Sequence, residues 1–343
     1  MAYRGMGGQD KKNGHREPPF SWPSPDGRIF FFSTPVRQTR CRRPDCSRNR
    51  ETGEGEAIAP EKELMIELED HFEDVIGKTL RGTGISDGVL SFLTNVAPDK
   101  IAELQQGVFD EVVVRAIAPA LGLDANSLVE LAGQAWRPEA VELDGLRQFN
   151  TLFDPDPDDP MSVNSYLIWD SQTKDAALFD TGADAGPALA LIDELGLTLE
   201  TLFITHSHID HIIDRDKVQA AHPGVQVRVN AREPVPDAKR FAVGEVFSIG
   251  TLRVNTRLTW GHSPGGTTYV INGLKRPVAV VGDALFAQSM GGGVISYKDA
   301  LATNRSEIFT LEDRTVICPG HGPMTSVAEE KTHNPFFPEF KPS

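Results

Sequence analysis

The stretch Thr205-His206-Ser207-His208-Ile209-Asp210-His211 decides how this chain is interpreted. It directly follows the apolar run Leu202-Phe203-Ile204, which predicts a buried strand. Neutral imidazole and carboxylate are ligand types that Zn²⁺ and Fe²⁺ accept, and a loop that leaves a rigid strand can direct several of them at one point. The stretch therefore predicts a metal site rather than a polar surface turn, with four candidate ligands: His206, His208, Asp210 and His211.

Three further polar residues stand beside glycines at the ends of predicted strands. They are His262 in Gly261-His262-Ser263-Pro264-Gly265, Asp283 in Gly282-Asp283-Ala284, and His321 in Pro319-Gly320-His321-Gly322. Glycines let backbone and side chains crowd around a shared centre. Any one of the three would be weak evidence, but together with the first stretch they give seven candidate ligands and use five of the nine histidines.

The sequence pattern from 141 to 343 predicts an α/β domain. Strands are predicted at Leu146 to Leu152, Ser162 to Trp169 and Ala176 to Asp180. Gly186 to Leu195 repeats apolar residues at helical spacing and precedes the strand that ends at Thr205. A strand, a helix and a strand in this order favour parallel pairing. A later helix is predicted from Tyr297 to Leu311, and Tyr297 could face the substrate pocket.

Two other segments precede this domain. Residues 1–60 hold 11 Lys or Arg against 7 Asp or Glu and are rich in Gly and Pro, which predicts an irregular basic arm. Residues 61–140 show helical spacing, with Leu68, Phe72, Val75 and Ile76 on one face, and predict a small helical domain in which Asp99 could cap a helix. The 17 acidic and 6 basic residues between positions 61 and 146 argue against a DNA-binding role for it.

Composition restricts the partners. The net charge of -15 disfavours nucleic acid and anionic membranes, so a small-molecule substrate is expected. No apolar run approaches the roughly 20 residues needed to span a bilayer, and the first residues do not resemble a signal peptide. Cys41, Cys46 and Cys318 are too few for a disulfide framework. We therefore expect a cytoplasmic protein, and its oligomeric state stays open.

The motifs resemble those of the metallo-β-lactamase superfamily, in particular its glyoxalase II-like branch, the hydroxyacylglutathione hydrolase-like metallo-hydrolases. The resemblance covers roughly residues 146 to 337. It rests on the first stretch and on Gly261 to Gly265, Gly282 to Phe286, and Cys318 to Pro323. It implies an αβ/βα sandwich of two sheets with the metals at one edge between them, preceded here by an N-terminal helical appendage.

The resemblance also implies a role for each ligand. One metal would be held by His206, His208 and His262, the other by Asp210, His211 and His321, and Asp283 would bridge the two. Asp180 matches a position behind the metals, where it would accept a hydrogen bond from a ligand imidazole and fix its tautomer. We expect two divalent metal ions, zinc in the first place, because zinc, iron and manganese all suit mixed histidine and carboxylate ligands.

The function implied by the resemblance is hydrolysis of a small thioester or related acyl ester. A water that bridges the two cations would become hydroxide and attack the carbonyl, with Asp210 and Asp283 as the catalytic carboxylates. Two alternatives remain, a persulfide dioxygenase with one ferrous ion on His206, His262 and Asp283, and a non-catalytic binding module. Glyoxalase II carries a C-terminal helical domain for glutathione, whereas only 22 residues follow His321, so we do not carry that glutathione site over.

Overall fold

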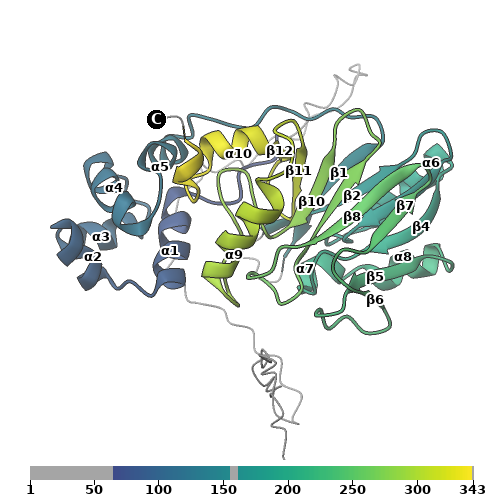
Figure 1. Ribbon diagram of the computed structural model, residues 1–343, viewed down its shortest axis with the longest axis horizontal. Helices are drawn as coiled ribbons and strands as arrows, with labels where there is room; N and C mark the ends of the chain where they lie inside the picture. The colour runs from purple at the N-terminus through teal and green to yellow at the C-terminus, as the bar shows by residue number, and fades with distance from the viewer. Residues whose placement is uncertain (1–64, 155–160, 342–343) are drawn as a thin grey trace, which may run out of the picture. The chain divides into compact units, whose positions relative to one another are not determined.

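The computed structural model describes residues 65–154 and 161–341, which belong to one compact unit (Figure 1). The predicted basic arm, residues 1–60 with Cys41 and Cys46, lies outside the described residues. The domain boundaries at 60 and 140 therefore remain predictions. Within the described ranges, no helix is both long and apolar enough to cross a membrane.

Two six-stranded sheets form the centre of this unit. The first contains, in spatial order, β1 (Leu146–Phe153), β2 (Met161–Trp169), β3 (Asp175–Phe179), β4 (Thr198–Phe203), β5 (Gln226–Asn230) and β6 (Lys239–Phe241). The second runs in spatial order from β12 to β7, and its strands are β7 (Val246–Ile249), β8 (Leu252–Leu258), β9 (Thr267–Asn272), β10 (Val278–Gly282), β11 (Val316–Pro319) and β12 (Thr325–Ser326). β3 and β4 pair in parallel, which confirms the pairing predicted from the strand, helix, strand pattern.

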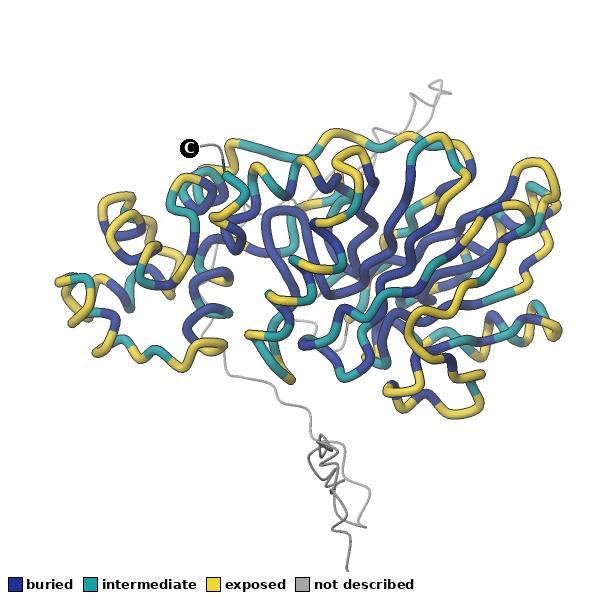
Figure 2. Tube along the Cα trace, viewed as in Figure 1, coloured by how far each residue is buried: buried dark blue, intermediate teal, exposed yellow. Residues whose placement is uncertain are grey.

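Alternating side chains of the strands build three apolar layers. Val280 and Cys318 point between the sheets, where they meet Phe179 and Phe203, whereas Ile317 points to the opposite face. Helices α6 (Gly186–Leu195) and α8 (Arg215–Ala221) cover the outer face of the first sheet. Helices α9 (Tyr297–Thr303) and α10 (Val327–His333) cover that of the second. Figure 2 shows how continuous the burial of the central strands is. The arrangement confirms the predicted αβ/βα sandwich.

Five α-helices precede the first strand within the described residues, and we call residues 65–132 the helical block. They are α1 (Phe72–Thr83), α2 (Asp87–Thr94), α3 (Pro98–Leu104), α4 (Glu111–Ile117) and α5 (Ala125–Ala132). Their apolar faces share one core with α9, α10 and the outer face of the second sheet. The block therefore thickens the helical layer on that sheet, and it brings α1 against α9 (Figure 1).

Three local expectations were wrong. Asp99 does not cap α3, because the helix begins one residue earlier at Pro98, a residue that suits the first helical turn. Leu68 precedes α1, although it still packs on the shared core. The helix predicted from Tyr297 to Leu311 is α-helical only to Thr303 and continues as one π-helical turn over Asn304–Ile308. There the Asn304 side chain turns inward to donate to the Ala284 carbonyl.

Candidate metal centre

All seven predicted ligands meet at one edge of the sandwich. His206 and His208 follow β4, and Asp210 and His211 lie in the short helix α7 (Ile209–Ile212) that comes next; His262, Asp283 and His321 come after β8, β10 and β11. Glycine allows this crowding, since a Cβ atom at Gly320 would lie 2.0 Å from Asp283 Oδ1.

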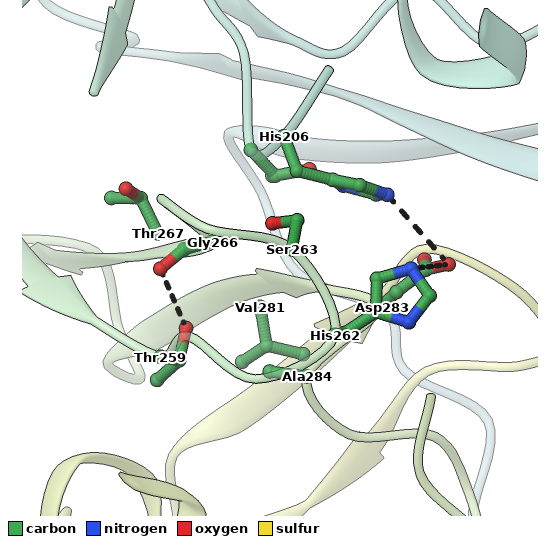
Figure 3. Close-up of a pocket in the computed structure, with 10 residues that line it drawn as sticks. His206, Thr259, His262, Ser263, Gly266, Thr267, Val281, Asp283 and Ala284 are labelled. Atoms are coloured by element: carbon green, nitrogen blue, oxygen red, sulfur yellow. Dashed lines mark hydrogen bonds and ion pairs between the residues drawn. The ribbon is translucent and has the colours of Figure 1, made fainter. Parts of the chain in front are cut away.

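The ligands form two groups within which the ligand atoms lie no more than 4.8 Å apart: His206, His208, His262 and Asp283 in the first group, and Asp210, His211 and His321 in the second. Asp283 also faces the second group. Its Oδ1 lies 3.3 Å from His211 Nε2, and its Oδ2 lies 3.5 Å from His321 Nε2 and 3.3 Å from His262 Nε2. Figure 3 shows His206 and His262 directed at this carboxylate from two sides. Asp283 thus stands between the two groups.

The geometry of the first group fits a shared cation. His208 Nδ1 lies 3.0 Å from both His206 Nε2 and His262 Nε2. Three imidazoles on one tetrahedral zinc, each about 2.0–2.1 Å from the metal, would have their nitrogens about 3.3 Å apart. These two distances are therefore close to those expected for ligands of one metal ion.

Orphaned polar atoms lie where Asp283 faces the second group. His211 Nε2 and Asp283 Oδ1 are buried, and neither has a hydrogen-bond partner among the described residues. A buried polar atom left without a partner costs about 1–3 kcal/mol. A cation held between these atoms and Asp210 would satisfy them, so the residues present fit a metal here too.

Burial and neighbouring charges set the protonation of the ligands. Burial lowers the pKa of His206 well below its usual range and that of His262 to about 4. Burial alone would raise the pKa of Asp283, but His321, His211 and His206 hold it well below its usual range. These three residues therefore have the neutral-imidazole and carboxylate forms that bind cations. Against its burial, Asp283, Asp210 and Asp180 raise the pKa of His211 to about 10, so a metal must displace a proton from it.

The outward-facing nitrogen of several ligands meets a fixed acceptor. His211 Nδ1 lies 2.8 Å from Asp180 Oδ2, the contact predicted for Asp180 from sequence. His262 Nδ1 lies 2.9 Å from the Gly292 carbonyl oxygen, and His321 Nδ1 lies 2.7 Å from that of Ser162. An acceptor behind a ligand imidazole fixes its tautomer and leaves Nε2 free for the metal.

Two acidic residues at the site were missed by the sequence reasoning. Glu233 is fully buried and accepts hydrogen bonds from the backbone of Ser207 and Gly265, so it connects the two loops that carry the histidines of the first group. Glu69, from the helical block, places its Oε2 3.9 Å from His321 Nδ1, and burial raises its pKa to about 7. Neither residue stands in a motif, so no local signal could have identified it.

Cys318 is buried between the sheets, and Tyr166 is buried with its hydroxyl donating to the Pro319 carbonyl.

A cavity of about 10 Å³, room for about one water, lies against the first group (Figure 3). Its walls are Thr205, His206, Thr259, His262, Ser263, Gly266, Thr267, Val281, Asp283 and Ala284.

Comparison with known proteins agrees with this geometry. The family model described as metallo-beta-lactamase superfamily matches residues 158–321. Hydroxyacylglutathione hydrolase GloC of Haemophilus influenzae is 29% identical over 198 residues, which are 50% of this chain and 92% of that protein. The uncharacterized protein ML0493 of Mycobacterium leprae is 30% identical over 207 residues, 51% of this chain and 94% of that protein.

A third relative has a different chemistry. The human mitochondrial persulfide dioxygenase ETHE1 is 31% identical over 188 residues, 52% of this chain and 72% of that protein. The superfamily therefore includes an oxidoreductase beside its hydrolases. The family match at residues 158–321 includes all seven predicted ligands. On the match of the family model and of these relatives, the chain belongs to the metallo-β-lactamase superfamily of metal-binding enzymes.

Proposed function

We propose that this protein is a dinuclear metallo-hydrolase that acts on a small thioester or a related acyl ester, in the manner of hydroxyacylglutathione hydrolases. The observation that carries the proposal is the position of Asp283, whose two oxygens face histidines of both ligand groups at 3.3 to 3.5 Å. A carboxylate placed in this way suits two cations better than one. Zinc is our first expectation for both, with iron or manganese as the other candidates.

The residues of the chain divide the work as follows. Two divalent cations would supply an acidified water and polarise the substrate carbonyl. Asp210 Oδ2 lies 3.4 Å from both His211 Nε2 and His321 Nε2. Burial opposes its ionisation, yet these two histidines lower its pKa, so it is an ionised carboxylate beside the reaction site. Asp210 can therefore accept a hydrogen bond from the attacking water and orient it, without a serine or cysteine nucleophile.

The net charge and the relatives support the proposed substrate class. The net charge of -15 favours a small molecule over nucleic acid or an anionic membrane. GloC, by its name, hydrolyses a hydroxyacylglutathione, and thioesters are therefore the first class to test.

A persulfide dioxygenase is the second candidate, and the similarity to ETHE1 favours it. One ferrous ion would then be held by His206, His262 and Asp283, which all lie in the first group. The complete second group argues for the hydrolase, since a single-ion enzyme would leave Asp210, His211 and His321 without a metal ion to bind.

The deciding experiment measures activity and metal together. We expect hydrolysis of thioesters that is lost on chelation and restored by zinc or iron, and lost in His211→Ala but kept in His222→Ala, a histidine outside both groups. Oxygen consumption with glutathione persulfide and one iron per chain would favour the dioxygenase. A fully loaded protein that hydrolyses no thioester, lactone or phosphodiester contradicts the proposal, and freshly purified protein without metal would favour a binding module.

A further inference from the structure

Lys78, in α1, is where the helical block reaches towards the metal centre. Only 15% of its side chain is exposed. Its ammonium pairs with the Asp70 carboxylate, donates to the Met290 carbonyl oxygen at 2.9 Å, and lies 5.2 Å from the centre of the Phe286 ring. A largely buried ammonium is costly unless it is paired. These contacts thus compensate for its burial, and two of them are to one loop.

That loop, residues 286–293, lies directly behind the ligands. The Gly292 carbonyl oxygen accepts from His262 Nδ1 at 2.9 Å. A Cβ atom at Gly291 would lie 1.9 Å from the Asp283 carbonyl oxygen, so the loop packs on this residue without room for a side chain. The Phe286 ring meets the His321 ring edge-on, with 5.6 Å between centroids. The 286–293 loop therefore touches His262, Asp283 and His321, which come from both ligand groups.

The helical block contacts the 286–293 loop at several points. Besides the Lys78 contact to Met290, the Ser289 hydroxyl donates to Asp70. Tyr297 packs between α1 and the end of the loop, because a Cβ atom at Gly82 would overlap its ring and one at Gly293 would overlap its backbone. The Tyr297 hydroxyl donates to Thr79 of α1, and Tyr297 is not among the walls of the cavity in Figure 3. That it faces a substrate pocket stays a prediction.

We propose that Lys78 and Asp70 are positioning residues for the metal centre, which act through the 286–293 loop to hold His262 and His321 in their binding orientations. Neither residue belongs to the two ligand groups. The adjacent Glu69, 3.9 Å from His321 Nδ1, extends the same segment to the second group. The effect on metal affinity rests on the proposed dinuclear centre, whereas the effect on the loop does not.

The test removes the ammonium and measures the loop and the metal separately. Lys78→Met keeps the aliphatic stem but cannot pair with Asp70 or donate to Met290. In the metal-free full-length protein, we expect faster hydrogen–deuterium exchange in peptides covering residues 286–293. In chelator competition, we expect zinc affinity to fall about 10- to 100-fold, as for other groups behind ligands. Lys78→Arg, which keeps charge and donors, should restore most of both.

Two controls separate positioning from simple stability. Lys100→Met removes an exposed lysine of the same block that pairs with Glu103, and it should change neither quantity. Leu90→Ala removes a fully buried side chain of α2, which packs on α3 and α4, and it should lower the melting temperature but not the zinc affinity. If Lys78→Met does not fold, Asp70→Asn asks the same question of the partner.

The outcomes are distinct. If Lys78→Met has the same zinc affinity and the same loop exchange as the unaltered protein, the inference is overturned. An equal loss of zinc affinity in Leu90→Ala, at a melting temperature equal to that of Lys78→Met, would also overturn it. The helical block would then act on the metal centre only through stability. If the unaltered protein binds no metal, the proposed function fails, while the loop exchange still decides whether the block positions the loop.

Discussion

Asp180 offers the sharpest test of how the protein builds its second ligand group. Its carboxylate is buried and accepts three hydrogen bonds, from Thr205 N and Thr205 Oγ1 at 2.7 Å each and from His211 Nδ1 at 2.8 Å. Asp180→Asn keeps the shape, and asparagine tolerates the positive φ of 55° at this position. In either orientation, however, the new amide NH₂ faces at least one group that donates to the carboxylate.

The size of the effect follows from these contacts. A buried donor that meets another donor loses a partner, at a cost of about 1–3 kcal/mol. Part of that cost falls on the orientation of His211, and removing a group behind a ligand imidazole weakens metal binding by about 10- to 100-fold. We therefore expect the zinc affinity of the second site to fall by about this factor, equivalent to about 1.4–2.8 kcal/mol.

The assay is competition with a chromophoric chelator on the folded variant, with a melting curve as a check. Asp184→Asn is the matched control, because Asp184 lies nearby in sequence but its side chain is 56% exposed and pairs with Lys217. It should bind zinc like the unaltered protein. Unchanged affinity for both metals in a folded Asp180→Asn variant would refute the role assigned to this carboxylate.

Three further changes probe the frame around the site. Gly291→Ala should lower the free energy of unfolding in urea by about 1–3 kcal/mol, because its Cβ would lie 1.9 Å from the Asp283 carbonyl oxygen. Gly292→Ala, where the nearest atom is 3.8 Å away, should lower it much less. Equal losses in the two variants would contradict the packing argument. The melting temperature of Glu330→Gln relative to that of the unaltered protein should rise from pH 5 to pH 8. Burial raises the pKa of Glu330 from 4.5 to about 8, so the unaltered folded state favours the protonated carboxyl and loses stability as pH rises through this window, whereas glutamine does not titrate. A difference independent of pH would argue against it. Tyr166→Phe should lose about 0.5–1.5 kcal/mol in the same unfolding assay, since it removes the 2.7 Å hydrogen bond to the Pro319 carbonyl; no loss would show that the bond contributes nothing net.

The part of the site that sequence could predict is the part encoded locally. His206 to His211 directly follow an apolar strand. His262, Asp283 and His321 each stand beside glycines after a further strand. Strand ends meet at the edges of a sheet, so residues at such ends converge whatever lies between them. The strands and the parallel β3–β4 pair could be predicted for the same reason, because an apolar run and a periodic helix are both local patterns.

The groups behind the ligands could not be predicted, because their contacts are long-range. Gly292 accepts from His262 across 30 residues, and Lys78 donates to Met290 across 212. The apolar spacing of α1 indicates that one face is buried, but it carries no information on the surface that covers it. The packing of the helical block on α9 and on the 286–293 loop therefore emerges only in three dimensions.

The most direct test of the central claim is the metal content of the purified protein and of one variant, by elemental analysis against protein concentration. If Asp283 joins two sites, the unaltered chain should hold two metal ions, and His321→Ala, which removes a ligand of the second group alone, should hold one and keep its first-group ligands intact. One ion per chain in the unaltered protein, with no change in His321→Ala, would contradict the two-site account.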